Sequence, residues 1–102
     1  MNRYDYKKLD SLFHSRIRLA AASLLYHDGS ADFNWMKMQI GATDGNLTTH
    51  LRKMEEARYI TVEKSFSGRK PHTVYSLTDT GRKAFEEYMK RLEMFIQPEQ
   101  KE

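Results

Sequence analysis

The chain has 102 residues, with 17 Lys and Arg, 14 Asp and Glu and no Cys, for a net charge of +3. This length suits one hydrophobic core, and the lack of cysteine excludes disulfides, thiolate metal sites and a thiol nucleophile. No stretch approaches the roughly 20 apolar residues of a membrane span, and Met1 to Lys8 lacks the apolar run of a signal peptide. We therefore expect a soluble cytoplasmic protein with no membrane partner, folded as a single domain over residues 1–96 and ending in a disordered polar tail at 97–102.

Amphipathic periodicity predicts two helices at the start of the chain. In residues 8–13 the apolar side chains fall at i, i+3 and i+4, which places them on one helical face. Ser15 is a favourable capping residue for a second helix, whose apolar period continues to the turn-forming residues at 27–30.

A helix pair joined by a tight turn is expected next. Asn34 is expected to cap the first helix, which ends at Gly41, and residues 31–33 could form a short strand before it. The second helix is expected over residues 44–57. Its buried stripe has the spacing i, i+4 and i+7 and consists of Leu47, Leu51 and Met54.

A β-hairpin and a last helix complete the pattern. β-Branched and aromatic residues alternate over 59–66, turn-forming residues occupy 67–71, and an extended pattern resumes over 72–77. Thr78 or Asp79 is expected to cap a final helix with a long apolar and aromatic band. A tight helix pair followed by a two-stranded wing is a winged helix-turn-helix. The predicted fold class is therefore α+β and mostly helical, with a wing sheet of two or three strands and terminal dimerisation helices.

The helix over 44–57 has an outward face suited to DNA. With Leu47 taken as the inward direction, a rotation of about 100° per residue turns small polar and cationic residues outward. Short side chains let a helix approach the floor of the major groove, while Arg and Lys reach bases or phosphates. Charged residues on a helix usually form only a solvent-exposed face. Here the helix-turn-helix to which this helix belongs and the basic hairpin after it favour DNA contact. The residues predicted to face DNA are Gly45, Thr48, Thr49, Arg52 and Lys53.

The hairpin tip is basic. Cations there would contact the phosphate backbone or the neighbouring minor groove, although exposed edge hairpins also use Lys and Arg to avoid aggregation. Between residues 52 and 83 there are eight cations and four anions, so the positive excess lies in this half of the chain. The predicted wing contacts are Lys64, Arg69, Lys70 and His72.

The final helix carries more apolar surface than one small domain is expected to cover. This surplus predicts a homodimer in which terminal helices pack together, although the band could instead belong to an ordinary core helix. Tyr and Met side chains between such helices could line a pocket for an unknown small-molecule effector, or serve only as packing. The residues predicted for the dimer interface are Tyr4, Tyr6, Leu9, Phe85, Tyr88, Met89, Leu92, Phe95 and Ile96.

Catalytic and metal-binding patterns are missing from the sequence. The four histidines lack paired ligand spacing, and we find no nucleophile beside a base, no phosphate-binding glycine loop and no convincing carboxylate pair. We therefore predict no enzymatic activity, no cofactor and no metal.

Segments within residues 9–19, 44–51, 55–60 and 77–82 share a family pattern in their order and spacing. In these segments the chain resembles the winged-helix transcriptional regulators of the MarR and ArsR type, in particular their small single-domain branch. The resemblance implies a dimer on a roughly two-fold symmetric operator, without the metal-binding residues of the metal-sensing members. A departure is Arg58, where the family usually has a glycine. The resemblance places in DNA-facing positions Asn46, Thr48, Thr49, Arg52 and the Arg69–Lys70 tip.

Together these patterns predict a homodimeric transcriptional regulator that binds double-stranded DNA sequence-specifically. The helix over 44–57 would enter the major groove, and the wing over 64–72 would contact the backbone or the minor groove. The alternative is a winged-helix module that has lost DNA binding and holds a protein partner. Salt-dependent binding to duplex fragments distinguishes the two.

Overall fold

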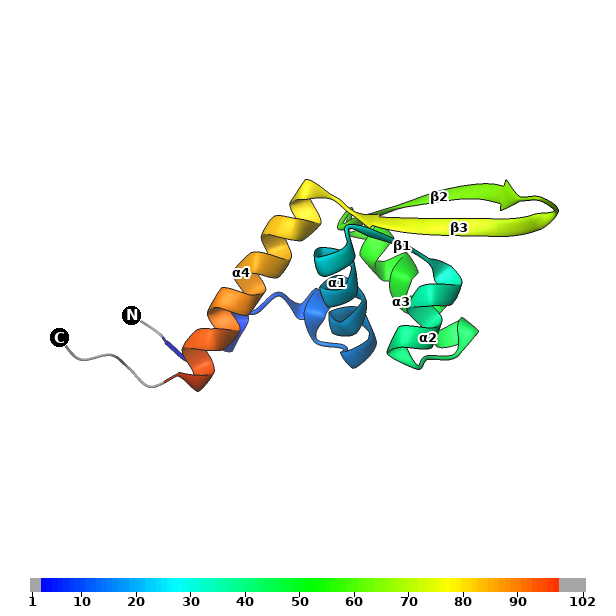
Figure 1. The fold of residues 1–102 in the computed structure, drawn as a ribbon. Helices are drawn as coiled ribbons and strands as arrows, with labels where there is room; N and C mark the ends of the chain where they lie inside the picture. Colours follow the sequence, from blue (N-terminus) through cyan, green and yellow to red (C-terminus); the bar gives the residue numbers. More distant parts are fainter. Residues whose placement is uncertain (1–2, 98–102) are drawn as a thin grey trace.

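The computed structural model describes residues 3–97, so residues 98–102 of the predicted tail lie outside it (Figure 1). The fold is α+β and mostly helical, with the winged helix-turn-helix arrangement that the sequence predicts. Its elements, in chain order, are two 3-10 helices (Tyr6–Lys8 and Ser11–Phe13), α1 (Arg16–Asp28), β1 (Ser30–Asp32), α2 (Phe33–Ile40), α3 (Asp44–Glu56), β2 (Ile60–Ser67), β3 (Lys70–Leu77) and α4 (Asp79–Ile96).

Two expectations about the helices are wrong. The helix expected over 8–13 is replaced by two 3-10 turns, because Asp10 has an extended backbone and its carboxylate accepts a hydrogen bond from Leu12 N. Helix α2 begins one residue before Asn34, because Asp32 at the end of β1 caps it by accepting from Trp35 N at 2.8 Å. Ser15 caps α1 as expected, accepting from Arg18 N.

The three strands form one antiparallel sheet in the order β1-β3-β2, so the short strand that the sequence left possible at 31–33 is present, over Ser30–Asp32. The hairpin strands run further than expected, because the turn between them has only two residues. Ser67 pairs with Lys70 across that turn, and Gly68 has the positive φ of 68° that such a tight turn requires. The outer part of the hairpin therefore projects beyond the helices (Figure 1).

Helix α3 is held on the domain by one face. Its apolar stripe of Leu47, Leu51 and Met54 is buried, as predicted, in a core shared with α1, α2 and α4. Burial of side chains of this size contributes about 1.5–3 kcal/mol each, so the stripe fixes which side of α3 faces solvent. The fully buried or nearly buried core side chains are Phe13, Ala21, Ala22, Leu25, Ala31, Met36, Leu47, Leu51, Met54, Ile60, Phe85 and Tyr88.

The start of α4 packs closely against the connection that leaves α3. Arg58 ends that turn with a φ of 64°, in the left-handed region that favours glycine. Thr78 holds the connection twice, because its N–H donates to Tyr59 O at 3.0 Å and its hydroxyl donates to Arg58 O at 2.8 Å. Gly81 lies directly on this backbone, since a Cβ there would be 2.9 Å from the Tyr59 carbonyl carbon and closer still to its oxygen.

A side-chain bridge also joins α1 to α3. The Arg18 guanidinium donates to Leu12 O at 2.5 Å and lies 2.8 Å from His50 Nδ1. Arginine can only donate, so His50 accepts at Nδ1 and carries no proton there. Burial lowers the pKa of His50, and the charges of Arg18 and Lys53 lower this pKa further.

Replacement of Gly81 by alanine should destabilise the fold by about 3 kcal/mol or more, because the new methyl group would overlap the Tyr59 carbonyl. Urea unfolding followed by circular dichroism measures this loss. Gly45→Ala is the matched control, since nothing lies within 4 Å of a Cβ at that helical position. It should leave stability unchanged or raise it by up to about 1 kcal/mol. Equal effects of the two substitutions would show that α4 does not depend on this close approach.

Stability should fall at mildly acidic pH because of His50. The unfolded imidazole titrates near its ordinary value of 6.5 and the folded one at a lower pH. Between these values the unfolded chain binds more protons, so the stabilisation is fully present above 6.5 and is lost as pH falls through the folded pKa. His50→Gln should flatten this dependence in unfolding experiments between pH 5 and 8, whereas His14→Gln should retain it. Parallel curves for wild type and His50→Gln would contradict the role of the Arg18–His50 bridge.

Candidate nucleic-acid interface

The outward face of α3 is open to solvent along its length. All six residues that the sequence predicts to face DNA from this helix are exposed, and none packs into the subunit's core. Thr43 caps the helix by accepting from Asn46 N at 3.2 Å, which fixes the first turn and leaves the next polar side chains free. These exposed residues are Gly45, Asn46, Thr48, Thr49, Arg52 and Lys53.

One acidic side chain at the start of this face has a cationic partner. Asp44 lies 2.5 Å from Lys37 Nζ, so α2 supplies a positive charge beside the first turn of α3. Both side chains are well exposed, so the pair adds little stability. Its consequence is electrostatic, because a neutralised Asp44 repels a phosphate less than a free carboxylate would.

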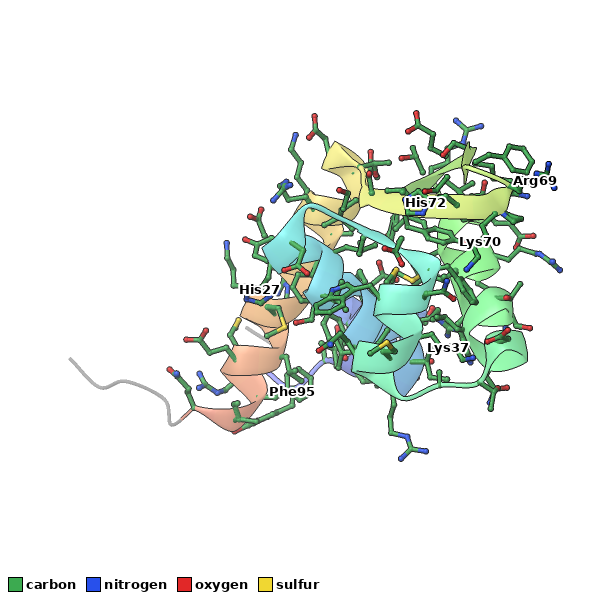
Figure 2. The ribbon with its side chains drawn as sticks, turned by 45° about the vertical axis from the view of Figure 1, so that its right-hand side comes forward. His27, Lys37, Arg69, Lys70, His72 and Phe95 are labelled. Carbon is green, nitrogen blue, oxygen red and sulfur yellow. The ribbon has the colours of Figure 1, made fainter. Side chains whose placement is uncertain are left out.

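The wing cations are divided between the two faces of the hairpin. Lys64, Arg69 and Lys70 are exposed and His72 is half-buried. Lys70 pairs with Ser67 and His72 with Ser65, whereas Lys64 pairs with Thr73. Side chains alternate along strands, so Lys64 lies on the opposite face from Lys70 and His72, and Arg69 lies in the turn. Figure 2 shows Arg69 at the tip of the hairpin, with Lys70 and His72 following it along β3. The four residues therefore cannot all contact one flat surface.

The predicted DNA contacts keep their charges unneutralised by the protein. Within residues 3–97 the ion pairs are Lys37–Asp44 and Arg91–Glu87, and neither involves a cation of α3 or the wing. The same part of the chain contains no group of three His, Asp or Glu side chains able to hold a metal ion, and no helix long and apolar enough to cross a membrane.

The residues predicted for a dimer interface fall into three groups. Phe85 and Tyr88 are 4% exposed and pack on Phe13 with ring centroids 5.7 and 5.1 Å apart, so they belong to the subunit's own core. Leu9 and Leu92 pack partly against that core, and the Tyr4 and Phe95 rings meet edge to face at 5.9 Å. Tyr4 is nevertheless 67% exposed, and three further side chains are exposed and available to a partner: Tyr6, Met89 and Ile96.

An open groove of about 710 Å³ runs between α1 and α4. Phe85, Met89 and Ile96 contribute apolar surface to it. Tyr26 of α1 lines its side and donates to Glu86 at 2.7 Å, and this hydrogen bond raises the pKa of the Tyr26 hydroxyl. The sequence did not identify Tyr26, because its contact partner lies 60 residues away on another helix.

Comparison with known proteins identifies the family. Residues 17–96 match the family model described as a winged helix DNA-binding domain. An uncharacterized protein of Methanocaldococcus jannaschii is 36% identical over 78 residues, covering 76% of this chain and 85% of the relative.

Solved structures share the fold at lower identity. A transcriptional regulator homologue from Pyrococcus horikoshii OT3 superposes with a TM-score of 0.85 at 24% identity, covering 94% of this chain and 95% of the other. NadR, solved in complex with 4-hydroxyphenylacetate, gives a TM-score of 0.69 at 20% identity, with coverages of 86% and 64%. YtfH from Salmonella typhimurium gives a TM-score of 0.71 at 20% identity, with coverages of 81% and 73%. The chain thus shares the fold of these solved structures, and by its match over residues 17–96 it belongs to the family of winged helix DNA-binding domains.

Proposed function

We propose that this protein regulates transcription by binding double-stranded DNA as a homodimer, with α3 in the major groove. The observation that carries the proposal is the exposed polar and cationic face of α3 beside a projecting basic hairpin, with neither set of cations paired inside the subunit. A duplex offers the complementary surface, because its phosphates attract these cations and its major groove admits a helix.

The two parts of this surface have different tasks. Thr48, Thr49 and Arg52 project from a rigid helix that is fixed by three buried side chains, so their positions are defined well enough to read base edges. Arg69 and Lys70 lie at the end of a hairpin whose tip is exposed on all sides, so they suit phosphate contacts that need less exact placement.

The far end of α4 supports the dimer. Its C-terminal half extends away from the wing, and the segment before α1 lies beside it (Figure 1). Ile96, Met89 and Tyr6 leave apolar surface open there, next to the groove along α1. A second copy that covers this surface would bury it and place two recognition helices on one side of the duplex, about 34 Å or 10 base pairs apart.

Arg52→Ala should weaken binding to duplexes selected from a randomised pool by about 5- to 150-fold for each half-site and relax the preference at one base position in each half-site. The double substitution Arg69→Ala and Lys70→Ala should instead lower the salt slope by about 4, because a dimer loses four cations, and leave the preference intact. Filter binding between 50 and 200 mM NaCl measures both effects. Lys8→Ala is the control, since Lys8 is an exposed cation of the 3-10 helix Tyr6–Lys8, and that segment lies away from α3 and the wing (Figure 1).

The result that overturns the proposal is a wild-type protein that shows no salt-dependent binding to duplex DNA. A winged-helix module that holds a protein partner would then be the better account. Equal affinity and equal base preference for wild type and Arg52→Ala would show that Arg52 does not contact DNA. This result would not contradict the proposed wing contacts.

Ile96→Glu should convert the dimer to a monomer in sedimentation equilibrium, because a carboxylate would have to be buried in an apolar contact. The substitution should not unfold the subunit, since Ile96 is 76% exposed. Met38→Glu alters a side chain of similar exposure, 73%, on α2 and should remain dimeric. A wild-type protein that sediments as a monomer at concentrations where it binds DNA would contradict the homodimer.

A further inference from the structure

Phe66 is an aromatic side chain without a packing role in the subunit. It lies near the outer end of β2 and is 74% exposed. The other large hydrophobic side chains exposed in residues 3–97 lie on α2, on α4 or before α1. Within these residues Phe66 is therefore the one exposed large hydrophobic side chain of the wing. Its cross-strand partner Pro71 leaves most of it in contact with water.

Positive charge surrounds this ring. Alternation along β2 places Phe66 on the same face as Lys64, and Arg69 lies in the turn three residues after Phe66, whereas Lys70 lies on the opposite face. Every residue from 63 to 70 is exposed, so neither the ring nor the cations are covered by another element. An apolar ring framed by cations is complementary to a duplex, whose phosphates lie outside and whose stacked bases lie inside.

We propose that Phe66 is a wedge that enters between two adjacent base pairs from the minor groove and partly unstacks them. Lys64 and Arg69 hold the flanking phosphates and keep the hairpin tip at the groove. The inference rests on the proposed function, because it takes the wing as a DNA contact. It adds a residue with a distinct task, which is to deform the duplex rather than to neutralise it.

The wedge gives the wing a sequence preference without hydrogen bonds to bases. Unstacking is easiest at flexible pyrimidine–purine steps such as TA and CA, so binding favours such a step at the position under the wing. The insertion also bends the duplex away from the wing, towards the major groove that α3 occupies. Both the step preference and the bend depend on the volume of the Phe66 side chain and not on the positive charges beside it.

The test uses the full chain and a duplex selected by wild-type binding, with 2-aminopurine placed in turn at each position under the wing. Wild type should raise the fluorescence of 2-aminopurine at one step in each half-site and bring dyes at the two duplex ends closer together. Phe66→Ala should lose both signals and bind about tenfold more weakly with an unchanged salt slope. Phe66→Leu should keep much of the signal, because leucine also serves as a wedge. Met38→Ala, which removes an equally exposed side chain from α2, should behave as wild type.

Three outcomes would contradict the wedge, and they can be told apart. If wild type binds the duplex but Phe66→Ala gives the same fluorescence, bend and affinity, the wedge is overturned and the proposed function stands. If wild type fails to bind any duplex, the proposed function itself falls and the wedge falls with it. A Phe66→Ala protein that binds DNA normally but no longer self-associates would assign the ring to a contact between copies, which also overturns the wedge.

Discussion

The position of every functional surface depends on how Tyr59 is held between α3 and β2. Its carbonyl accepts from Thr78 N and its backbone lies under Gly81, which fixes the start of α4. Its ring stacks on Phe13 at 5.7 Å, and its hydroxyl donates to Asp10 at 2.5 Å. Burial, together with the Asp10 carboxylate, raises the pKa of Tyr59 to about 12. One residue thus joins the N-terminal segment, the exit of α3, the base of the wing and the start of α4.

This junction separates two surfaces of different chemistry. On one side lie the polar face of α3 and the basic wing, whose attraction to a charged partner weakens as the salt concentration rises. On the other side the distal half of α4 exposes apolar side chains, which gain free energy when they are covered. The base of the wing and the start of α4 are both held at the same backbone segment, which contains Tyr59.

The spacing of apolar residues and the capping residues in the sequence were sufficient to predict the elements that position the DNA-facing residues. The i, i+4, i+7 spacing on α3 specifies its buried side, and cap chemistry at Ser15 specifies the start of α1. Pattern failed where two local signals compete. Asp32 and Asn34 are both good caps, and the earlier one prevails because β1 ends beside it. At residues 8–13 a helical period coincides with Asp10, whose side-chain hydrogen bond favours a 3-10 turn instead.

Contacts between distant residues could not be read from the sequence. The Arg18–His50 bridge spans 32 residues and the Tyr59–Asp10 hydrogen bond spans 49, so no periodicity encodes them. The sequence predicts the apolar band of α4, but it does not show which of these side chains are buried within the subunit and which stay exposed. Phe85 and Tyr88 pack on Phe13, and that residue lies more than 70 positions earlier in the chain. Only the tertiary fold therefore separates core from exposed surface on this helix.

The stability of the wing falls from its base to its tip, which is the end proposed to meet DNA. Ile60 is buried and Tyr75 packs partly against the core, and β1 pairs with the base of β3 over residues 74–76. Beyond the Glu63–Val74 pair no third strand from residues 3–97 lies beside the hairpin, and a two-stranded hairpin alone is marginally stable in water. Local opening at the tip therefore costs less free energy than opening at the base. The outer cations and Phe66 can adjust to the groove without disturbing α3, so the helix keeps its register while the wing adapts.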